Sequence, residues 1–103
     1  MDDSQLKNAK FLLVDDEQYN LELLEVVLKK AGYQQISSTT DPRRVLPLFI
    51  EYKPDILVLD FNMPNMTGLD VICQVVPRLP ADSFFPILVI TSEMAPEVKH
   101  KVL

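Results

Sequence analysis

The sequence predicts an α/β protein built on one parallel β-sheet with helices on both faces. Short, continuous apolar runs, which are typical of strands buried on both faces, occur at residues 11–14, 56–59 and 86–90. Longer segments with apolar residues at helical spacing lie between these runs. A chain of 103 residues, of which 48% are hydrophobic, has room for one domain with one core. We therefore expect a single domain over residues 1–103, with residues 1–9 as a polar lead-in.

The first strand, at residues 11–14, ends abruptly in three acidic residues, Asp15, Asp16 and Glu17. A helix is predicted from about Gln18, and Gly32 is placed to cap its carboxyl end. The basic residues of its last turn, Lys29 and Lys30, interact favourably with the negative end of the helix dipole. Its inward face is expected to carry Leu21, Leu24, Leu28 and Ala31.

A weaker second strand is predicted at residues 35–38, where the polar sequence is typical of a sheet edge. Asp41 and Pro42 then provide an N-cap and a first-turn proline for a second helix, which runs toward Tyr52. Pro47 falls inside this helix and is expected to remove a hydrogen bond and kink it.

The third strand, at residues 56–59, also ends in a carboxylate, Asp60. Thr67 and Gly68 are expected to start a third helix, which Pro77 and Pro80 end. The predicted inward positions of this helix are Leu69, Ile72, Cys73 and Val76, with Cys73 as a small buried hydrophobe.

The fourth strand, at residues 86–90, is followed by Thr91 and Ser92. A fourth helix is predicted from near Ala95, and the chain is expected to stop within it or just after it.

Composition excludes several classes of function. The formal net charge of −5 and the pI near 4.7 argue against a nucleic-acid-binding surface, which needs clustered lysine and arginine. No apolar run approaches the roughly 20 residues needed to cross a bilayer, and the acidic start is unlike a signal peptide. One cysteine cannot form an intrachain disulfide. We therefore expect a cytoplasmic protein that contacts neither nucleic acid nor membrane.

The ends of the apolar strands carry the residues expected to do chemistry. Parallel strands joined by right-handed crossovers bring their carboxyl ends to one edge of the sheet, so Asp15, Asp16, Asp60 and Thr91 should meet there. Three adjacent carboxylates repel one another, and a hard dication such as Mg²⁺ relieves that repulsion. Each acidic residue alone is equally compatible with a structural role at a strand end, but together they predict a Mg²⁺-dependent phosphoryl-transfer site.

In such a site a carboxylate attacks phosphorus in line and becomes an acyl phosphate. Asp60 is the expected nucleophile because it follows directly on an apolar strand. The turn at residues 62–64 could direct the Asn62 backbone carbonyl toward the metal, and the Thr91 hydroxyl could bind the phosphoryl group.

Four segments, read in order, resemble the receiver domain of two-component response regulators. They are residues 11–17, 57–64, 65–70 and 87–92. The resemblance implies a flavodoxin-like, doubly wound parallel sheet with strand order 2-1-3-4 in this chain. That family continues into a fifth strand, which carries a lysine, and a fifth helix, both of which are missing here.

By this resemblance, Asp16 would bind Mg²⁺ directly and Asp15 mainly through water. Asp60 would be both a metal ligand and the phosphoryl acceptor, and Asn62 would contribute its backbone carbonyl.

The resemblance also implies roles for residues around the phosphoryl group. Thr91 would be the switch hydroxyl, and the side chains of Asn62 and Glu93 would modulate the lifetime of the acyl phosphate. The implied donor is a phosphohistidine on a sensor histidine kinase or a phosphotransfer protein. The chain would then be a signalling domain that regulates an output module, with self-phosphorylation and autodephosphorylation as its only chemistry.

No lysine in the chain matches the family's switch lysine, because Lys99 and Lys101 follow Thr91 too closely. We therefore expect Mg²⁺ binding with weak switching. We also expect an exposed fourth-strand edge that supports a homodimer or a swapped arrangement, which light scattering would detect, or else partial disorder near the C-terminus.

Two alternatives remain open. A pseudo-receiver would act only as a protein-interaction module and would never be phosphorylated. A Mg²⁺-dependent phosphohydrolase of the haloacid-dehalogenase type would carry a second aspartate two residues after the nucleophile, where this chain has Asn62.

Overall fold

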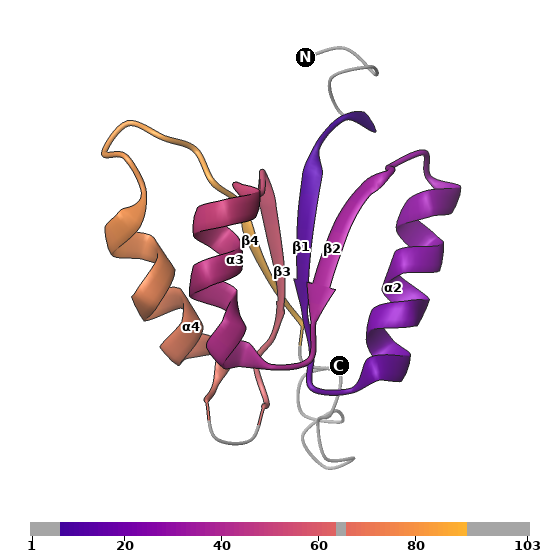
Figure 1. Cartoon of the computed structure of the whole chain (residues 1–103), viewed down its shortest axis with the longest axis horizontal. Coiled ribbons are helices and arrows are strands. Elements are labelled where there is room, and N and C mark those ends of the chain that lie inside the picture. The colour runs from indigo at the N-terminus through magenta and orange to yellow at the C-terminus, as the bar shows by residue number, and fades with distance from the viewer. Residues whose placement is uncertain (1–6, 64–65, 91–103) are drawn as a thin grey trace, which may run out of the picture.

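The computed structural model describes residues 7–63 and 66–90, which form a four-stranded parallel sheet in the order β2-β1-β3-β4 (Figure 1). The strands are β1 (Lys10–Val14), β2 (Gln35–Thr39), β3 (Ile56–Asp60) and β4 (Ile87–Ile90). This topology confirms the predicted strand order, including the position of the polar strand β2 at an edge of the sheet.

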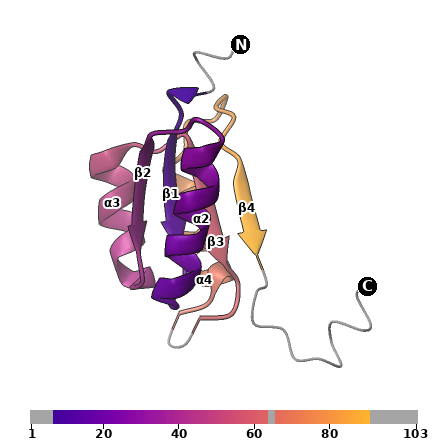
Figure 2. The same ribbon diagram turned by 90° about the vertical axis from the view of Figure 1, so that its right-hand side faces the viewer.

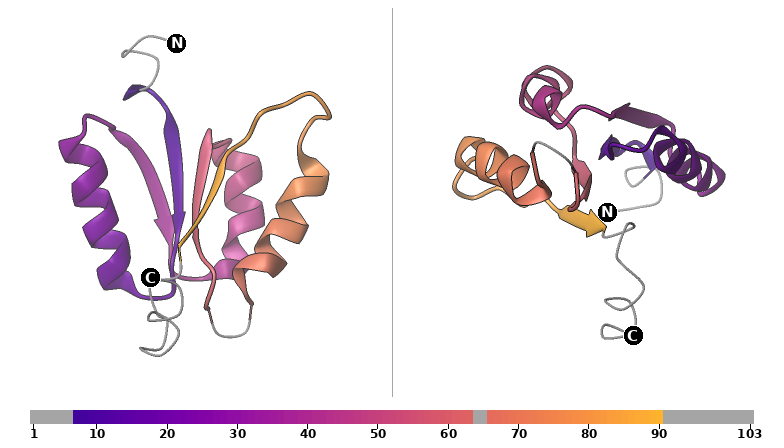
Figure 3. Two further views of the ribbon diagram at one scale, coloured as in Figure 1. Left: turned by 180° about the vertical axis from the view of Figure 1, so that it is seen from behind. Right: turned by 90° about the horizontal axis from the view of Figure 1, so that it is seen from below.

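Helices cover both faces of the sheet, as expected for parallel strands. Helix α2 (Gln18–Lys30) lies on one face, and α3 (Val45–Tyr52) and α4 (Gly68–Val75) lie on the other (Figure 3). The 3₁₀ turns η1 (Pro42–Arg44) and η2 (Val76–Arg78) adjoin α3 and α4.

The core has two parts because successive side chains of a strand point to opposite faces. On the α3 and α4 side, Leu12 and Val14 of β1 pack with Leu57 and Leu59 of β3. On the α2 side, the alternate residues of these strands pack against the inward face of α2. That cluster consists of Phe11, Leu13, Leu21 and Val58.

The predicted ends of α2 are largely confirmed. Gly32 has a φ of +103°, a left-handed conformation that suits glycine after a helix, and its N–H donates to the Lys29 carbonyl at 3.0 Å. Leu21 is buried on the inward face, with Leu24 and Leu28 partly buried beside it. Ala31 was predicted to face inward but is exposed, because it is already the C-cap residue of the helix.

The expected cap before the second helix is also present. The Asp41 carboxylate accepts a hydrogen bond from the Arg43 N–H at 3.0 Å and caps η1. Pro47 was expected to kink the helix, but it lies in the first turn of α3. A missing N–H is tolerated there, so the irregularity of this segment is the 3₁₀ turn that precedes α3.

The predicted inward face of α4 was right only for Ile72, which is partly buried against the core. Leu69 and Val76 are 55% and 47% exposed, and Cys73 is exposed as well, whereas Val71 and Val75 are fully buried. Apolar residues occupy most positions around this helix, so their spacing did not define one face. Contact with the sheet selected the face.

Strand β4 lies at the edge of the sheet away from β2 (Figure 2). Leu88 and Val89 are 55% and 43% exposed, and no described strand pairs with the outer side of β4. Pairing of two copies through this edge remains a prediction. Within the described residues, no helix has the length and apolar character needed to span a membrane.

Candidate metal centre

Three carboxylates meet at the carboxyl end of the sheet. Val14 of β1 lies opposite Leu59 of β3 in the parallel register, so the residues that follow, Asp15 and Asp60, are neighbours. One carboxylate oxygen from each of Asp15, Asp16 and Asp60 lies within 4.8 Å of the others. The predicted convergence of these residues is therefore present in the structure.

Asp15 is buried, with 3% of its surface exposed, and local hydrogen bonds hold its carboxylate in place. Its Oδ1 accepts from the Glu17 N–H at 2.9 Å, and the side chain of Asn20 also hydrogen-bonds to it. Burial raises the pKa of Asp15, these hydrogen bonds oppose the rise, and the charge of Asp16 adds to it. The surrounding hydrogen bonds therefore do not fully offset the cost of burying the negative charge of Asp15.

Asp60 is the last residue of β3 and is 1% exposed. Its Oδ1 accepts from the Asn62 N–H at 3.2 Å. Asp15 and Asp60 therefore make the same turn, in which an aspartate at a strand end accepts the N–H two residues later. An aspartate directly after an apolar strand is the sequence signal for this turn.

One carboxylate oxygen of Asp16 is the strongest indication of a metal site. Its Oδ1 is buried and has no hydrogen-bond partner among the described residues. The two ion pairs in that part of the chain lie elsewhere, between Lys29 and Glu25 and between Arg43 and Asp41. A buried acceptor that lies beside two further carboxylates, and forms no ion pair with a described residue, fits a hard metal ion with oxygen ligands.

Gly68 supports the backbone of the site, a role that the sequence did not reveal. Its N–H donates to the Phe61 carbonyl at 3.0 Å. A Cβ at this position would lie 2.9 Å from the Phe61 Cα and 3.0 Å from the Asp60 carbonyl oxygen. The first turn of α4 therefore approaches the backbone of Asp60 as closely as only glycine allows.

Of the remaining predicted site residues, Asn62 lies within the part of the chain that the structure describes. Asn62 lies in the loop after β3 with an exposed side chain, and its backbone N–H donates a hydrogen bond to the Asp60 carboxylate. Thr91 and Glu93 lie outside the described residues. The switch hydroxyl, the modulating side chains and the Asn62 carbonyl ligand remain predictions.

Comparisons with known proteins agree with this fold and site. The family model of the response regulator receiver domain matches residues 11–103. The chain is 35% identical over 66 residues to the chemotaxis protein CheY of Thermotoga maritima, covering 64% of this chain and 55% of the relative. It is 35% identical over 86 residues to the alkaline phosphatase synthesis transcriptional regulatory protein PhoP of Bacillus subtilis, covering 84% of this chain and 34% of the relative.

A solved structure, the chemotaxis response regulator CheY4 of Vibrio cholerae, matches with a TM-score of 0.72 and 34% identity over 91% of this chain and 77% of that chain. The chain thus spans between a third and about half of the length of the two curated relatives above. On the family match, the strand order and the acidic cluster, this chain belongs to the response regulator receiver domain family, the signalling domain of two-component systems.

Proposed function

We propose that this chain is a phospho-accepting receiver domain in which Asp60 takes a phosphoryl group in a Mg²⁺-dependent reaction. The observation that carries the proposal is the cluster of Asp15, Asp16 and Asp60, in which a buried Asp16 oxygen has no described partner. A purely structural cluster would gain stability by pairing or exposing that oxygen.

The residues fit a hard dication. Asp16 and Asp60 would bind the ion directly, Asp15 would hold its water, and the Asn62 carbonyl would complete the protein ligands. Bound Mg²⁺ would neutralise negative charge on the phosphoryl oxygens. The chain's own residues would supply the nucleophile and its orientation.

The Asn62 N–H donates to Oδ1 of Asp60 and thereby orients the carboxylate, and an oxygen of this carboxylate would attack. In the step proposed here, that oxygen forms a bond to phosphorus while the bond from phosphorus to the histidine nitrogen of the donor breaks. The nitrogen keeps the electron pair of the broken bond, and Asp60 becomes an acyl phosphate. The Thr91 hydroxyl would then donate a hydrogen bond to an oxygen of the phosphoryl group.

The donor in this proposal is a sensor histidine kinase or a phosphotransfer protein. The regulated output and a cytoplasmic location belong to the same proposal, as does the assignment of residues 1–103 to one receiver domain. Support comes from the family match over residues 11–103.

Phosphorylation by a small donor tests the proposal. The full chain is incubated with phosphoramidate and Mg²⁺, and its intact mass is measured. We expect the gain of one phosphoryl group, no gain for Asp60→Asn, and an unchanged gain for Asp82→Asn, a matched change at an exposed loop residue. Chelation of Mg²⁺ should prevent the reaction.

Two results would overturn the assignment. Folded protein that takes up no phosphoryl group would favour the interaction-only pseudo-receiver. Sustained turnover of p-nitrophenyl phosphate that depends on Asp60 would instead favour a phosphohydrolase.

A further inference from the structure

A cavity of about 570 Å³ lies at the end of the molecule opposite the acidic cluster. Helices α3 and α4 lie close at their amino ends and diverge toward their carboxyl ends (Figure 1). The cavity occupies the carboxyl ends of both helices and the loop that leads into β4. Its principal lining residues are Phe49, Ile50, Lys53, Arg78, Phe84 and Phe85.

The walls of the cavity are built by specific local structure. Lys53 ends α3 in a left-handed conformation, with a φ of +54°, and the buried Pro54 follows it. Phe49 and Phe85 pack edge to face with ring centroids 5.4 Å apart, which joins α3 to the loop before β4. The apolar wall is therefore anchored from two separate segments.

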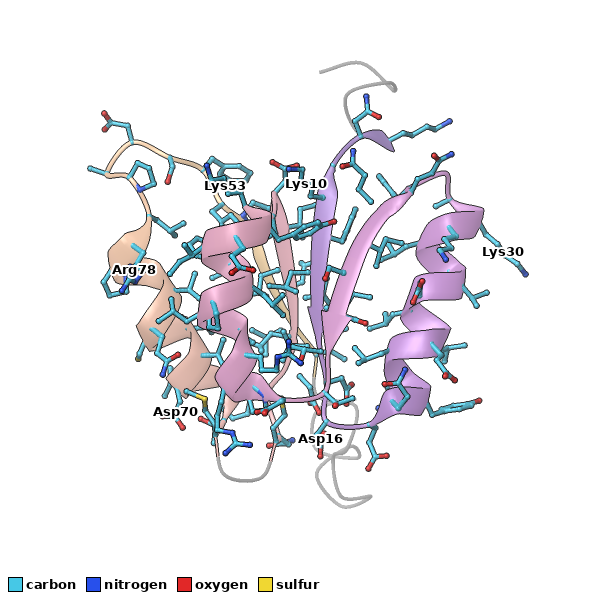
Figure 4. All side chains as sticks on the ribbon, in the orientation of Figure 1. Lys10, Asp16, Lys30, Lys53, Asp70 and Arg78 are labelled. Carbon is cyan, nitrogen blue, oxygen red and sulfur yellow. The ribbon has the colours of Figure 1, made fainter. Side chains whose placement is uncertain are left out.

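Two cations are among the lining residues, Lys53 at the end of α3 and Arg78 at the end of η2 (Figure 4). Neither forms an ion pair with another described residue. The Asp55 carboxylate also lines the cavity and keeps its negative charge, and its Oδ2 accepts the backbone N–H of Lys10 at 2.8 Å. The charged residues that line the cavity are thus two cations and one carboxylate, a local excess of positive charge on a chain that carries −5 as a whole.

The rim of the cavity carries a large aromatic side chain. Phe84 is 91% exposed, and burying such a ring on a partner would remove substantial apolar surface from water. The cavity volume lies within the range of roughly 300–1,000 Å³ that is typical of binding pockets. An apolar hollow bordered by an exposed ring, and by two cations that have no ion pair among the described residues, suits an occupant that is both apolar and anionic.

We propose that this cavity binds an acidic segment of a partner protein, with an aromatic or aliphatic side chain in the hollow and flanking carboxylates on Lys53 and Arg78. Charge complementarity selects this occupant, and the exposed ring provides contact area beyond the hollow. A nucleic acid does not fit, since two cations on an acidic protein cannot neutralise an extended phosphate backbone. This site is independent of the proposed chemistry at Asp60.

A peptide titration tests the proposal. The probe is acetyl-Asp-Glu-Phe-Leu-Asp-Glu-amide, added to the isotope-labelled full chain and followed by amide chemical shifts. We expect shifts at residues around the cavity, and weaker binding as salt concentration rises. The double variant Lys53→Asn with Arg78→Gln should bind about tenfold more weakly, since exposed ion pairs contribute modestly. Asparagine tolerates the left-handed conformation at position 53.

The matched control replaces two exposed cations elsewhere, Lys30→Gln with Arg44→Gln, and should bind as the parent does. Phe84→Ser removes an exposed ring and should weaken binding while leaving the spectrum of the free protein well dispersed. Asp60→Asn should bind normally, so failure at one site is distinguishable from failure at the other. Absence of shifts at millimolar peptide, or equal binding of a peptide with lysines in place of its acidic residues, would overturn the proposal.

Discussion

At the amino end of the sheet, Lys10 and Asp55 satisfy each other's polar groups. The Lys10 N–H donates to the Asp55 carboxylate at 2.8 Å, and the Asp55 N–H donates to the Lys10 carbonyl at 2.8 Å. At the carboxyl end, Asp15, Asp16 and Asp60 crowd together, and a buried oxygen of Asp16 lacks a described partner.

The two ends of one sheet thus follow different physical rules. The amino end lowers the free energy of the fold by pairing its donors and acceptors. The carboxyl end keeps buried charge that favours binding of a cation over stability of the metal-free protein. Removal of a carboxylate should therefore stabilise the metal-free protein at the carboxyl end and destabilise it at the amino end, and only substitutions at the carboxyl end should lower Mg²⁺ affinity.

The largest effect is expected from Gly68→Ala, at the carboxyl end. The added Cβ would collide with the backbone at Asp60 and Phe61, so we expect a loss of about 2–3 kcal/mol in the free energy of unfolding. Mg²⁺ affinity should fall as well, because the Asp60 backbone must shift. Urea unfolding and metal titration measure the two effects. Leu69→Ala, at the exposed neighbouring position, is the control, and equal stability of Gly68→Ala and Leu69→Ala would contradict the packing argument.

An intermediate effect is expected from Asp15→Asn, which removes one of the crowded charges and keeps an acceptor for the Glu17 N–H. We expect the metal-free protein to become more stable at neutral pH and Mg²⁺ affinity to fall about tenfold or more. Urea midpoints without Mg²⁺, and metal titrations, measure these changes.

The pH dependence of that gain has a definite sign. The pKa of Asp15 is raised in the folded state, chiefly by burial, so the folded protein favours the protonated carboxyl. The stability that Asp15 contributes is therefore complete at a pH below 3.8, the ordinary pKa of aspartate. That contribution is lost as pH rises through the raised pKa. The advantage of Asp15→Asn should therefore vanish in acid, and a variant less stable than the parent at neutral pH would refute the account.

The smallest effect is expected from Asp55→Ala, at the amino end. Loss of the acceptor for the Lys10 N–H should reduce the free energy of unfolding by about 1 kcal/mol. Mg²⁺ affinity should not change, because the substitution lies at the opposite end of the strands. Asp82→Ala provides the exposed control, and a fall in Mg²⁺ affinity for Asp55→Ala would erase the contrast between the two ends.

The sequence by itself determined the features that depend on nearby residues. The strand runs, the Gly32 cap and the Asp41 cap each follow from interactions that span only a few positions. Thr67 and Asp70 likewise form a reciprocal capping box at the start of α4, as the predicted start at Thr67 and Gly68 allowed. The acidic cluster was also predictable, because parallel strands necessarily bring their carboxyl ends together.

Only the tertiary structure decided which face of α4 is buried, because that helix is apolar on several sides and its contact with the sheet selects Val71 and Val75. The close approach of Gly68 to Asp60 and the cavity beside Phe84 were likewise undetermined by local pattern. Both arise where segments distant in sequence meet, and their geometry depends on how whole elements pack rather than on the spacing of residues within one element.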